Sequence, residues 1–203
     1  MISIIIPVHN HYNELEKCLD SISKQTFKDY EIIVVDDEFG VGANTARNFG
    51  FQESHGNFLL FCDADIIMEP VMLEQMINAL ESNPQSSYTY ASFNFGWKKF
   101  KLWPFDASRL RKMPYIHTTS LIRREHFPMF DEQIKRLQDW DLFLTMLEKG
   151  HKGVWIPKVL FGVKPRKSGM SKWLPGFMYS IPWIKSVREY KKAERVIKKK
   201  HEL

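Results

Sequence analysis

The sequence predicts an α/β fold in which helices flank a doubly wound, mostly parallel sheet. In the first half of the chain, short apolar, β-branched runs alternate with longer segments of helical periodicity. This alternation is typical of parallel strands joined by right-handed crossovers. The chain has 203 residues, 44% of them apolar and 26% charged. That composition suits one packed domain and excludes disorder, collagen and coiled coil.

Three strands are expected before residue 85. Residues 2–6 are a continuous apolar run closed by Pro7, which predicts a strand buried on both faces. Residues 31–35 predict a second buried strand, and residues 57–62 a third strand. Carboxylates follow the second and third strands directly, and ligands of doubly wound sheets bind outside these strand ends.

Each of these strands precedes a segment with helical periodicity. The expected helices span residues 12–25, 42–54 and 69–82. In the second helix, four small or apolar residues are expected to face the sheet: Ala43, Ala46, Phe49 and Gly50. The pattern changes after residue 85, where the expected elements are strands at 88–95, 117–122 and 153–160, a loop at 97–113 and a helix at 139–149.

The charges are divided unevenly along the chain. The formal net charge is +5, but residues 1–97 sum to −10 and residues 98–203 to +15. The total alone would suggest a polyanionic partner. The strand-end carboxylates lie in the acidic half, and without a bound cation this half would repel the phosphates of a nucleic acid. We therefore expect no nucleic-acid partner.

Two cysteines, Cys18 and Cys62, cannot form a disulfide framework, and both lie in apolar periodic segments. We therefore expect buried free thiols and a reducing compartment. The N-terminus lacks the features of a secretion signal, and no apolar stretch is long enough to span a bilayer. These observations favour a cytoplasmic location.

The chemistry is concentrated at the strand ends. Asp63 and Asp65 lie two residues apart after the third strand, so both side chains can face one cation. Oxygen ligands suit Mg²⁺ or Mn²⁺. No glycine-rich phosphate loop follows the first strand, which argues against a dinucleotide oxidoreductase and a P-loop enzyme. A cation shared between carboxylates and a diphosphate is a natural way to hold a nucleotide here.

Five ordered segments resemble family 2 glycosyltransferases of the GT-A fold: residues 3–10, 19–37, 46–50, 56–65 and 138–142. The resemblance spans residues 2 to about 171. It implies one GT-A domain at 1–171, with a donor half at 1–97 and an acceptor half at 98–171. Residues 172–203 would form a basic, aromatic-rich, helical C-terminal extension.

The resemblance also implies a role for each matching residue. Pro7, Val8 and His9 would line the base pocket. Asp37 would accept a hydrogen bond from the base, and Asp36 would support the turn or the ribose. Arg47 would lie near the nucleotide, Asp63 would approach the ribose or the metal, and Asp65 would be the main ligand of Mn²⁺ or Mg²⁺.

Asp139 matches the acidic residue that acts as general base in inverting members of the family. A carboxylate can take the proton of an acceptor hydroxyl within hydrogen-bond reach. The alternative is helix capping, because Asp139 begins a helical run; the two roles are compatible. Asp141 fits a structural role better.

Three features depart from the family pattern. Gln138 replaces a common Glu, and Glu38 and Phe39 replace a Gly-Ser turn. Lys164 or Arg166 lies near the position where relatives often carry a metal-binding His. Such a cation could contact the diphosphate and replace part of the metal's charge.

The basic C-terminal segment has two interpretations. Its mixture of aromatics, Lys and Arg suits peripheral contact with an anionic membrane. An ordinary packed helix with a solvated Lys face is equally consistent with this composition.

Taken together, the residues and the resemblance predict transfer of a sugar, with inversion, from a nucleoside diphosphate sugar, preferably a UDP-sugar. The acceptor would be a saccharide or lipid-linked hydroxyl in cell-surface polysaccharide or glycoconjugate synthesis. Two alternatives are a nucleotidyltransferase, whose usual Gly-rich signature is missing after the first strand, and a catalytically silent binding subunit, suggested by Gln138.

Overall fold

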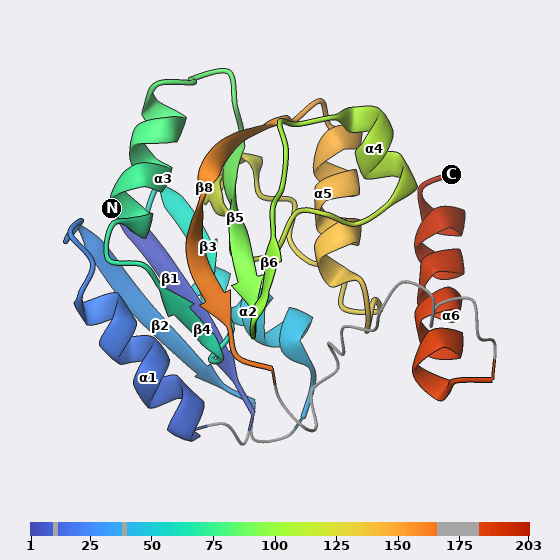
Figure 1. Cartoon of the computed structure of the whole chain (residues 1–203), viewed down its shortest axis with the longest axis horizontal. Helices are drawn as coiled ribbons and strands as arrows, with labels where there is room; N and C mark the ends of the chain where they lie inside the picture. The colour runs from blue at the N-terminus through green and yellow to red at the C-terminus, as the bar shows by residue number, and fades with distance from the viewer. Residues whose placement is uncertain (10–11, 38–39, 166–182) are drawn as a thin grey trace.

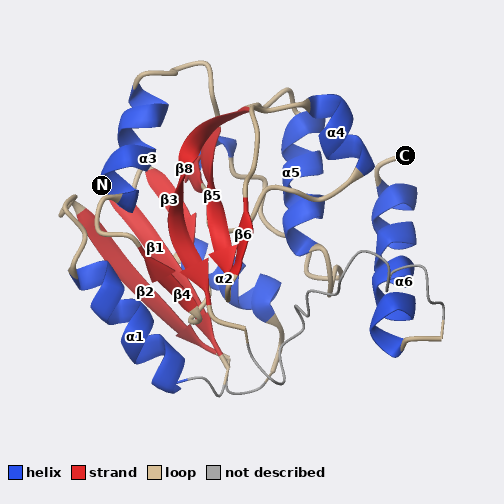
Figure 2. Ribbon diagram, in the orientation of Figure 1, coloured by secondary structure: helices blue, strands red, loops and turns tan. Residues whose placement is uncertain are grey.

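The computed structural model describes residues 1–9, 12–37, 40–165 and 183–203. One curled sheet forms the centre of the molecule (Figure 1). Helices α1 and α3 lie along one side of the molecule and α4, α5 and α6 along the other, while α2 is partly hidden behind the strands (Figure 2). The helices span Tyr12–Ser23 (α1), Ala43–Gln52 (α2), Met72–Glu81 (α3), Ala107–Lys112 (α4), Gln138–Glu148 (α5) and Lys185–Lys200 (α6).

Within the described ranges the sheet has eight strands, in the order β2-β1-β3-β7-β5-β8-β4, with β6 paired to β5. The strands are Ile2–Val8 (β1), Tyr30–Asp36 (β2), Phe58–Phe61 (β3), Ile66–Met68 (β4), Tyr88–Phe95 (β5), Lys98–Phe100 (β6), Leu121–Arg123 (β7) and Gly153–Val163 (β8). The pairings make β1, β2, β3, β5 and β8 run in one direction, and the short β4, β6 and β7 in the other. The predicted α/β fold with a mostly parallel sheet is confirmed.

β1 is the buried centre of the acidic half, as its apolar run predicts, but it continues through Pro7 to Val8. In a parallel strand the N–H and C=O of one residue point to the same neighbour. Ile5 C=O accepts from Cys62 N–H on the β3 side, so position 7 also faces β3. β3 ends at Phe61, so no residue of β3 is paired with position 7. The missing N–H of Pro7 therefore costs the sheet no hydrogen bond.

The prediction of a buried second strand is wrong. β2 is the edge of the sheet, and Ile32 and Val34 are 39% and 44% exposed. Val35 and Ile33 on its other face are half-buried, with Val35 against α2. An edge strand covered on one face has the same apolar sequence as a central strand, so composition alone could not separate the two.

The face that α2 turns inward is also only partly as predicted. Ala46 and Gly50 are buried, but Phe49 is 53% exposed. Polar residues occupy the inner face instead, because Asn44 and Asn48 donate hydrogen bonds to backbone carbonyls of Ile134 and Phe130. Because polar side chains on this face make buried hydrogen bonds, the spacing of the apolar residues of α2 does not show which face is buried.

The expected loop at residues 97–113 contains β6 and α4. Gly96, at φ 57°, makes the turn that folds β6 onto β5. Asp106 caps α4 by accepting from Arg109 N–H at 3.0 Å. Because many Lys and Arg residues interrupt this stretch, its apolar residues show no regular spacing that would predict either element. The expected strand at 117–122 is shorter than predicted and starts at Leu121.

Both cysteines are free and buried, as predicted. Their sulfur atoms lie 3.6 Å apart, between α1 and the end of β3. Burial, and next the neighbouring Cys18, raise the pKa of the Cys62 thiol well above its usual value. The Cys62 thiol therefore stays protonated, and both cysteines are core side chains.

Among the described residues, no helix has the length and apolar composition that crossing a bilayer requires. The basic segment after residue 184 forms α6. The predicted division of the chain at residue 171 lies outside the described residues.

Candidate active site

The predicted site residues of the first half lie at one edge of the sheet, where β1, β2 and β3 end. Val8 is paired with Asp36, and Ile5 with Phe61, so the segments that follow these strands are neighbours. His9 Nδ1 lies 2.6 Å from the backbone oxygen of Asp37. Pro7 is half-buried and Val8 is buried beside it.

Asp37 organises the loop between β2 and α2. Its carboxylate oxygens accept from the backbone N–H groups of Val41 and Gly42 at 2.7 and 2.9 Å. Gly40 and Gly42 have φ angles of 64° and 112°, which favour glycine. In an Asp-Asp-Gly-Ser turn, the flexible glycine would stand at position 38. Here Gly40 and Gly42 provide this backbone freedom, Gly40 two residues later than in that turn. Asp36 accepts from the Tyr12 hydroxyl at 2.7 Å.

Arg47 is the centre of the site and is almost entirely buried. Its Nη2 lies 2.6 Å from Asp63 Oδ1. Its Nη1 donates to the side-chain oxygens of Asn44 and Gln138 at 3.2 and 3.1 Å. The guanidinium therefore connects α2, the end of β3 and the start of α5. Gln138, which replaces a common Glu, is a neutral acceptor for a cation that already has a carboxylate partner.

Asp139 lies in the first turn of α5, half-buried and within the electrostatic reach of Arg47 and Asp63. Burial raises the pKa of its carboxyl above the usual value, against the lowering effect of the Trp140 N–H and the Arg47 charge. Asp139 Oδ1 accepts from Trp140 N–H at 2.8 Å. The N-cap of α5 is Leu137, at φ 58° and without a side-chain cap, so Asp139 is not the capping residue.

Asp63 and Asp65 fit a divalent cation. Both are half-buried, and they lie in a turn that the Ile66 N–H closes by donating to Asp63 C=O at 3.0 Å, so the alternation expected of an extended segment does not apply here. Within the described ranges, no cluster of three or more His, Cys, Asp or Glu residues could hold a metal without a substrate. Two carboxylates completed by diphosphate oxygens are a usual ligand set for Mg²⁺.

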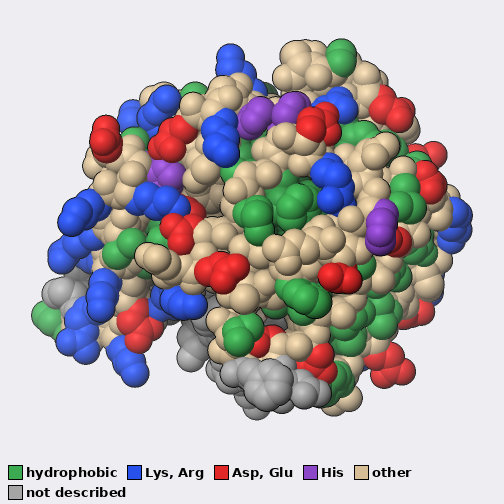
Figure 3. All heavy atoms as spheres, turned by 180° about the vertical axis from the view of Figure 1, so that it is seen from behind, with side chains coloured by type: hydrophobic (Ala, Val, Ile, Leu, Met, Phe, Trp, Pro, Cys, Tyr) green, Lys and Arg blue, Asp and Glu red, His purple; other side chains and the backbone are tan. Residues whose placement is uncertain are grey.

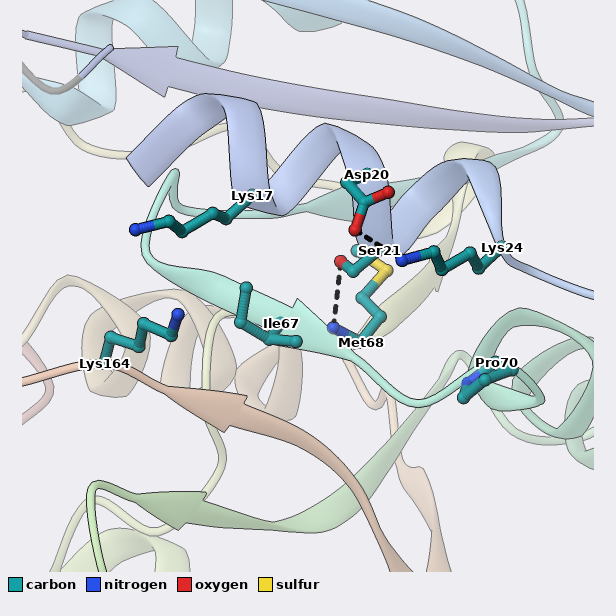
Figure 4. Close-up of a pocket in the computed structure, with 8 residues that line it drawn as sticks. All are labelled: Lys17, Asp20, Ser21, Lys24, Ile67, Met68, Pro70 and Lys164. Atoms are coloured by element: carbon teal, nitrogen blue, oxygen red, sulfur yellow. Dashed lines mark hydrogen bonds and ion pairs between the residues drawn. The ribbon is translucent and has the colours of Figure 1, made fainter. Parts of the chain in front are cut away.

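Lys164 is bound to this segment through its backbone, since its N–H donates to Asp65 C=O at 3.0 Å. Its side chain lines a shallow groove of about 300 Å³ between α1 and β4. Figure 4 shows Lys17 and Lys164 on opposite walls of this groove, with Ile67 between them. The other candidate for the diphosphate contact, Arg166, lies outside the described residues.

His117 is a residue that the sequence pattern did not reveal. It is half-buried, packed near the rings of Phe93 and Phe161, and lies within the electrostatic reach of Asp63 and Arg47. Burial, opposed by Asp63 and assisted by Arg47, lowers its pKa to about 4. Its Nδ1 accepts from Thr119 N–H at 3.0 Å, so the proton of the neutral ring is on Nε2. This atom has no hydrogen-bond partner in the described part of the chain.

Asp141, two residues after Asp139, belongs to a separate ion cluster. It is buried and contacts His201 at 2.9 Å and Lys200 at 2.7 Å. Its contacts therefore fix the end of α6 on α5.

Two relatives show how far the similarity extends. An uncharacterized glycosyltransferase of Haemophilus influenzae is 26% identical over 188 residues, which cover 73% of this chain and 63% of the relative. The amylovoran biosynthesis glycosyltransferase AmsE of Erwinia amylovora is 23% identical over 85% of this chain and 79% of its own length. The chain thus spans less than two thirds of the Haemophilus protein.

Two solved structures have the same fold. TarS of S. aureus in complex with UDP superposes with a TM-score of 0.69 at 17% identity, covering 81% of this chain and 60% of TarS. The mannosyltransferase PcManGT of Pyrobaculum calidifontis, in complex with GDP-Man and Mn²⁺, gives a TM-score of 0.64 at 17% identity and covers 83% and 58%. At such identities the likeness concerns the fold, and it supports the GT-A architecture.

A family model provides the remaining comparison. The model described as glycosyl transferase family 2 matches residues 3–39 and 38–138, which together are more than half of the chain. These segments contain the ends of β1, β2 and β3 and the Arg47 cluster. The chain therefore belongs to glycosyl transferase family 2.

Proposed function

We propose that this protein transfers a glycosyl unit from a nucleoside diphosphate sugar to an acceptor hydroxyl. The observation that carries the proposal is the cluster around Arg47, which brings Asp63 and the Gln138–Asp139 helix start to the edge of the sheet where Asp37 and His9 lie. Family membership supports this proposal. The UDP and GDP-Man complexes of proteins with the same fold support this class of donor.

The donor's nucleotide would lie against the ends of β1 and β2. Pro7, Val8 and His9 would form one wall, and Asp36 and Asp37 the other. Arg47, held by Asp63, supplies a fixed positive charge beside the phosphates. Asp65, with Asp63, would hold Mn²⁺ or Mg²⁺, which when bound neutralises the charge of the leaving diphosphate. UDP-sugars are the first donors to test, followed by GDP-mannose.

Asp139 would act as the general base in a single displacement. Its carboxylate accepts the proton of the acceptor hydroxyl while the oxygen attacks the anomeric carbon and the nucleoside diphosphate leaves. One displacement inverts the anomeric configuration. The raised pKa of Asp139 favours this role, because a more basic carboxylate is a better proton acceptor once ionised.

His117 would supply a neutral hydrogen-bond donor to a sugar hydroxyl. With its pKa lowered to about 4, the ring stays uncharged at neutral pH. Because Nδ1 is an acceptor for Thr119 N–H, Nε2–H is the group that can reach a ligand. A neutral donor can fix the orientation of a hydroxyl without adding a charge next to Arg47.

The acceptor is proposed to be a saccharide or a lipid-linked saccharide in the cytoplasm, at or near the membrane surface. AmsE, a relative similar over most of its length, is named for the biosynthesis of the polysaccharide amylovoran. We therefore place the reaction in cell-surface polysaccharide or glycoconjugate synthesis.

A thermal-shift screen of nucleoside diphosphate sugars with and without Mn²⁺ tests this function. A ligand at 100 times its dissociation constant stabilises the folded state by about 2.7 kcal/mol, which gives a readily measured shift. We expect stabilisation by at least one donor, followed by its slow hydrolysis. Absence of binding and of hydrolysis across a broad donor panel would contradict the proposal, as would release of pyrophosphate from a nucleoside triphosphate.

A further inference from the structure

Six cations form a continuous stripe on the outward face of α6. Lys and Arg side chains gather along the edge of the molecule where this helix lies (Figure 3). The stripe consists of Lys185, Arg188, Lys191, Lys192, Arg195 and Lys199, all of them exposed. At 3.6 residues per turn, these residues fall within an arc of about 120° and along about 21 Å of helix. No Asp or Glu of α6 lies within this arc.

The opposite face of α6 holds the helix on the protein body. Val187 and Ile197 are fully buried. Glu189 is paired with Arg136 at 2.6 Å, and His201 lies between Asp141 and Glu148 at 2.9 and 2.6 Å. α6 is thus a docked element, and its orientation fixes the stripe relative to the rest of the molecule.

The docking contacts do not use the stripe. The inward cations are neutralised, since Lys200 is bound to Asp131 and Asp141 and Lys198 to Glu194. None of the six cations of the stripe has an ion pair or hydrogen bond within the described ranges. Six like charges on one side of a helix repel each other, and a partner of opposite charge that covered them would relieve this repulsion.

We propose that the stripe of α6 binds the surface of an anionic phospholipid bilayer. Lipid headgroups offer many negative charges in one plane, which matches a straight, docked helix with its cations on one side. Trp183, two residues before the helix, is 79% exposed. Indole rings are favoured at the boundary between headgroups and acyl chains. A nucleic-acid duplex offers the same charge, but its bases are stacked inside it, so it has no comparable environment for the exposed indole at the end of the stripe.

Vesicle cosedimentation tests the proposal with the full chain. We expect binding to vesicles of phosphatidylcholine with 30% phosphatidylglycerol, weakening as salt is raised, and little binding to phosphatidylcholine alone. The test variant is Lys191→Gln with Lys192→Gln and Arg195→Gln. Each cation near an anionic surface contributes about fivefold to binding, so three losses predict a decrease of about a hundredfold. The matched control, Lys17→Gln with Lys24→Gln and Lys28→Gln, removes three exposed lysines at or after α1.

A fluorescence readout separates the bilayer from other polyanions. Vesicles should shift tryptophan emission to the blue, and Trp183→Phe should remove most of that shift. Circular dichroism of each variant establishes that it is folded. Equal loss of binding in the test and control variants would overturn the proposal, as would binding of an RNA duplex through the stripe without binding of vesicles. Vesicle binding needs no donor sugar, so its outcome is independent of the transfer reaction.

Discussion

Arg47 and Asp63 form an ion pair, with Nη2 and Oδ1 2.6 Å apart, that connects α2 to the end of β3. The Arg47 side chain is only 4% exposed, whereas that of Asp63 is 36% exposed. The pair therefore has a buried cation and a carboxylate that still faces the site. This asymmetry makes Arg47 a structural support and a component of the site at the same time.

Replacing Arg47 by Met should lower both stability and donor binding. Breaking a buried ion pair costs about 3–5 kcal/mol, and we expect the lower end because Asp63 can be rehydrated. Arg136→Met is the control, since Arg136 and Glu189 are also 2.6 Å apart but more exposed. Surface pairs contribute about 0–1 kcal/mol. Urea unfolding measures both variants, and equal losses would show that burial of Arg47 is not what matters.

Gly50 should tolerate no side chain. A Cβ atom added there would lie 2.5 Å from Ile5 Cγ2 in the core of the sheet. Overpacking of this kind typically costs about 1–3 kcal/mol, and we expect the upper part of this range, which exceeds the roughly 1 kcal/mol that Ala gains in helix propensity. Gly162→Ala is the control, because an added Cβ there meets nothing within 4 Å. Thermal unfolding should show a lower Tm for Gly50→Ala alone.

Docking of α6 should weaken as pH rises above neutrality. Burial alone would lower the pKa of His201, but the hydrogen bonds to Asp141 and Glu148 outweigh it and raise the pKa above the usual value. The folded state therefore holds this proton more tightly than the unfolded chain. The resulting stabilisation is complete below a pH of about 6.5, the unfolded pKa, and is lost as pH rises through the folded pKa.

Urea unfolding at a series of pH values from 6 to 9 measures this effect. The free energy of unfolding should fall across the window in the wild type, and His201→Gln should flatten that part of the profile. A profile in which stability rises with pH, with a slope that depends on His201, would contradict the assignment.

His117 should affect donor binding rather than the proton transfer. Loss of one hydrogen bond in His117→Ala should raise the KM for the donor about tenfold. In His117→Gln an amide N–H can replace Nε2–H and restore part of the loss. Because the pKa of His117 lies at about 4, kcat/KM should show no His117-dependent limb between pH 6 and 7. A limb in that range that disappears in His117→Gln would show that the ring titrates during the reaction.

The sequence predicts the fold well where its signals are local. The range 88–95 is predicted to the residue for β5, because aromatic and β-branched residues dominate it. The strand-end carboxylates are equally local features. By contrast, β2 is an edge strand because no other strand of the described residues pairs with its outer side, and no local sequence pattern carries that information.

The site is predicted as far as the family motifs extend. Arg47, Asp63 and Asp139 could be named from the resemblance, but the contacts of Arg47 with Asp63 and with Gln138 join segments distant in the sequence, the second of them 91 residues away. His117 lies in a stretch that reads as a strand, and its role depends on the pocket that Phe93 and Phe161 form around it. The docking of α6 through His201 likewise joins two distant segments.

Asp139→Asn tests directly whether Asp139 is the general base of the transfer. The variant should bind the donor with unchanged affinity by calorimetry but lose at least about a hundredfold in kcat for transfer, as expected for removal of a general base. Asp141→Asn, on the same helix but in the ion cluster with α6, should lower stability and leave kcat nearly unchanged. Turnover by Asp139→Asn at the wild-type rate, with the donor still bound, would show that Asp139 is not the general base.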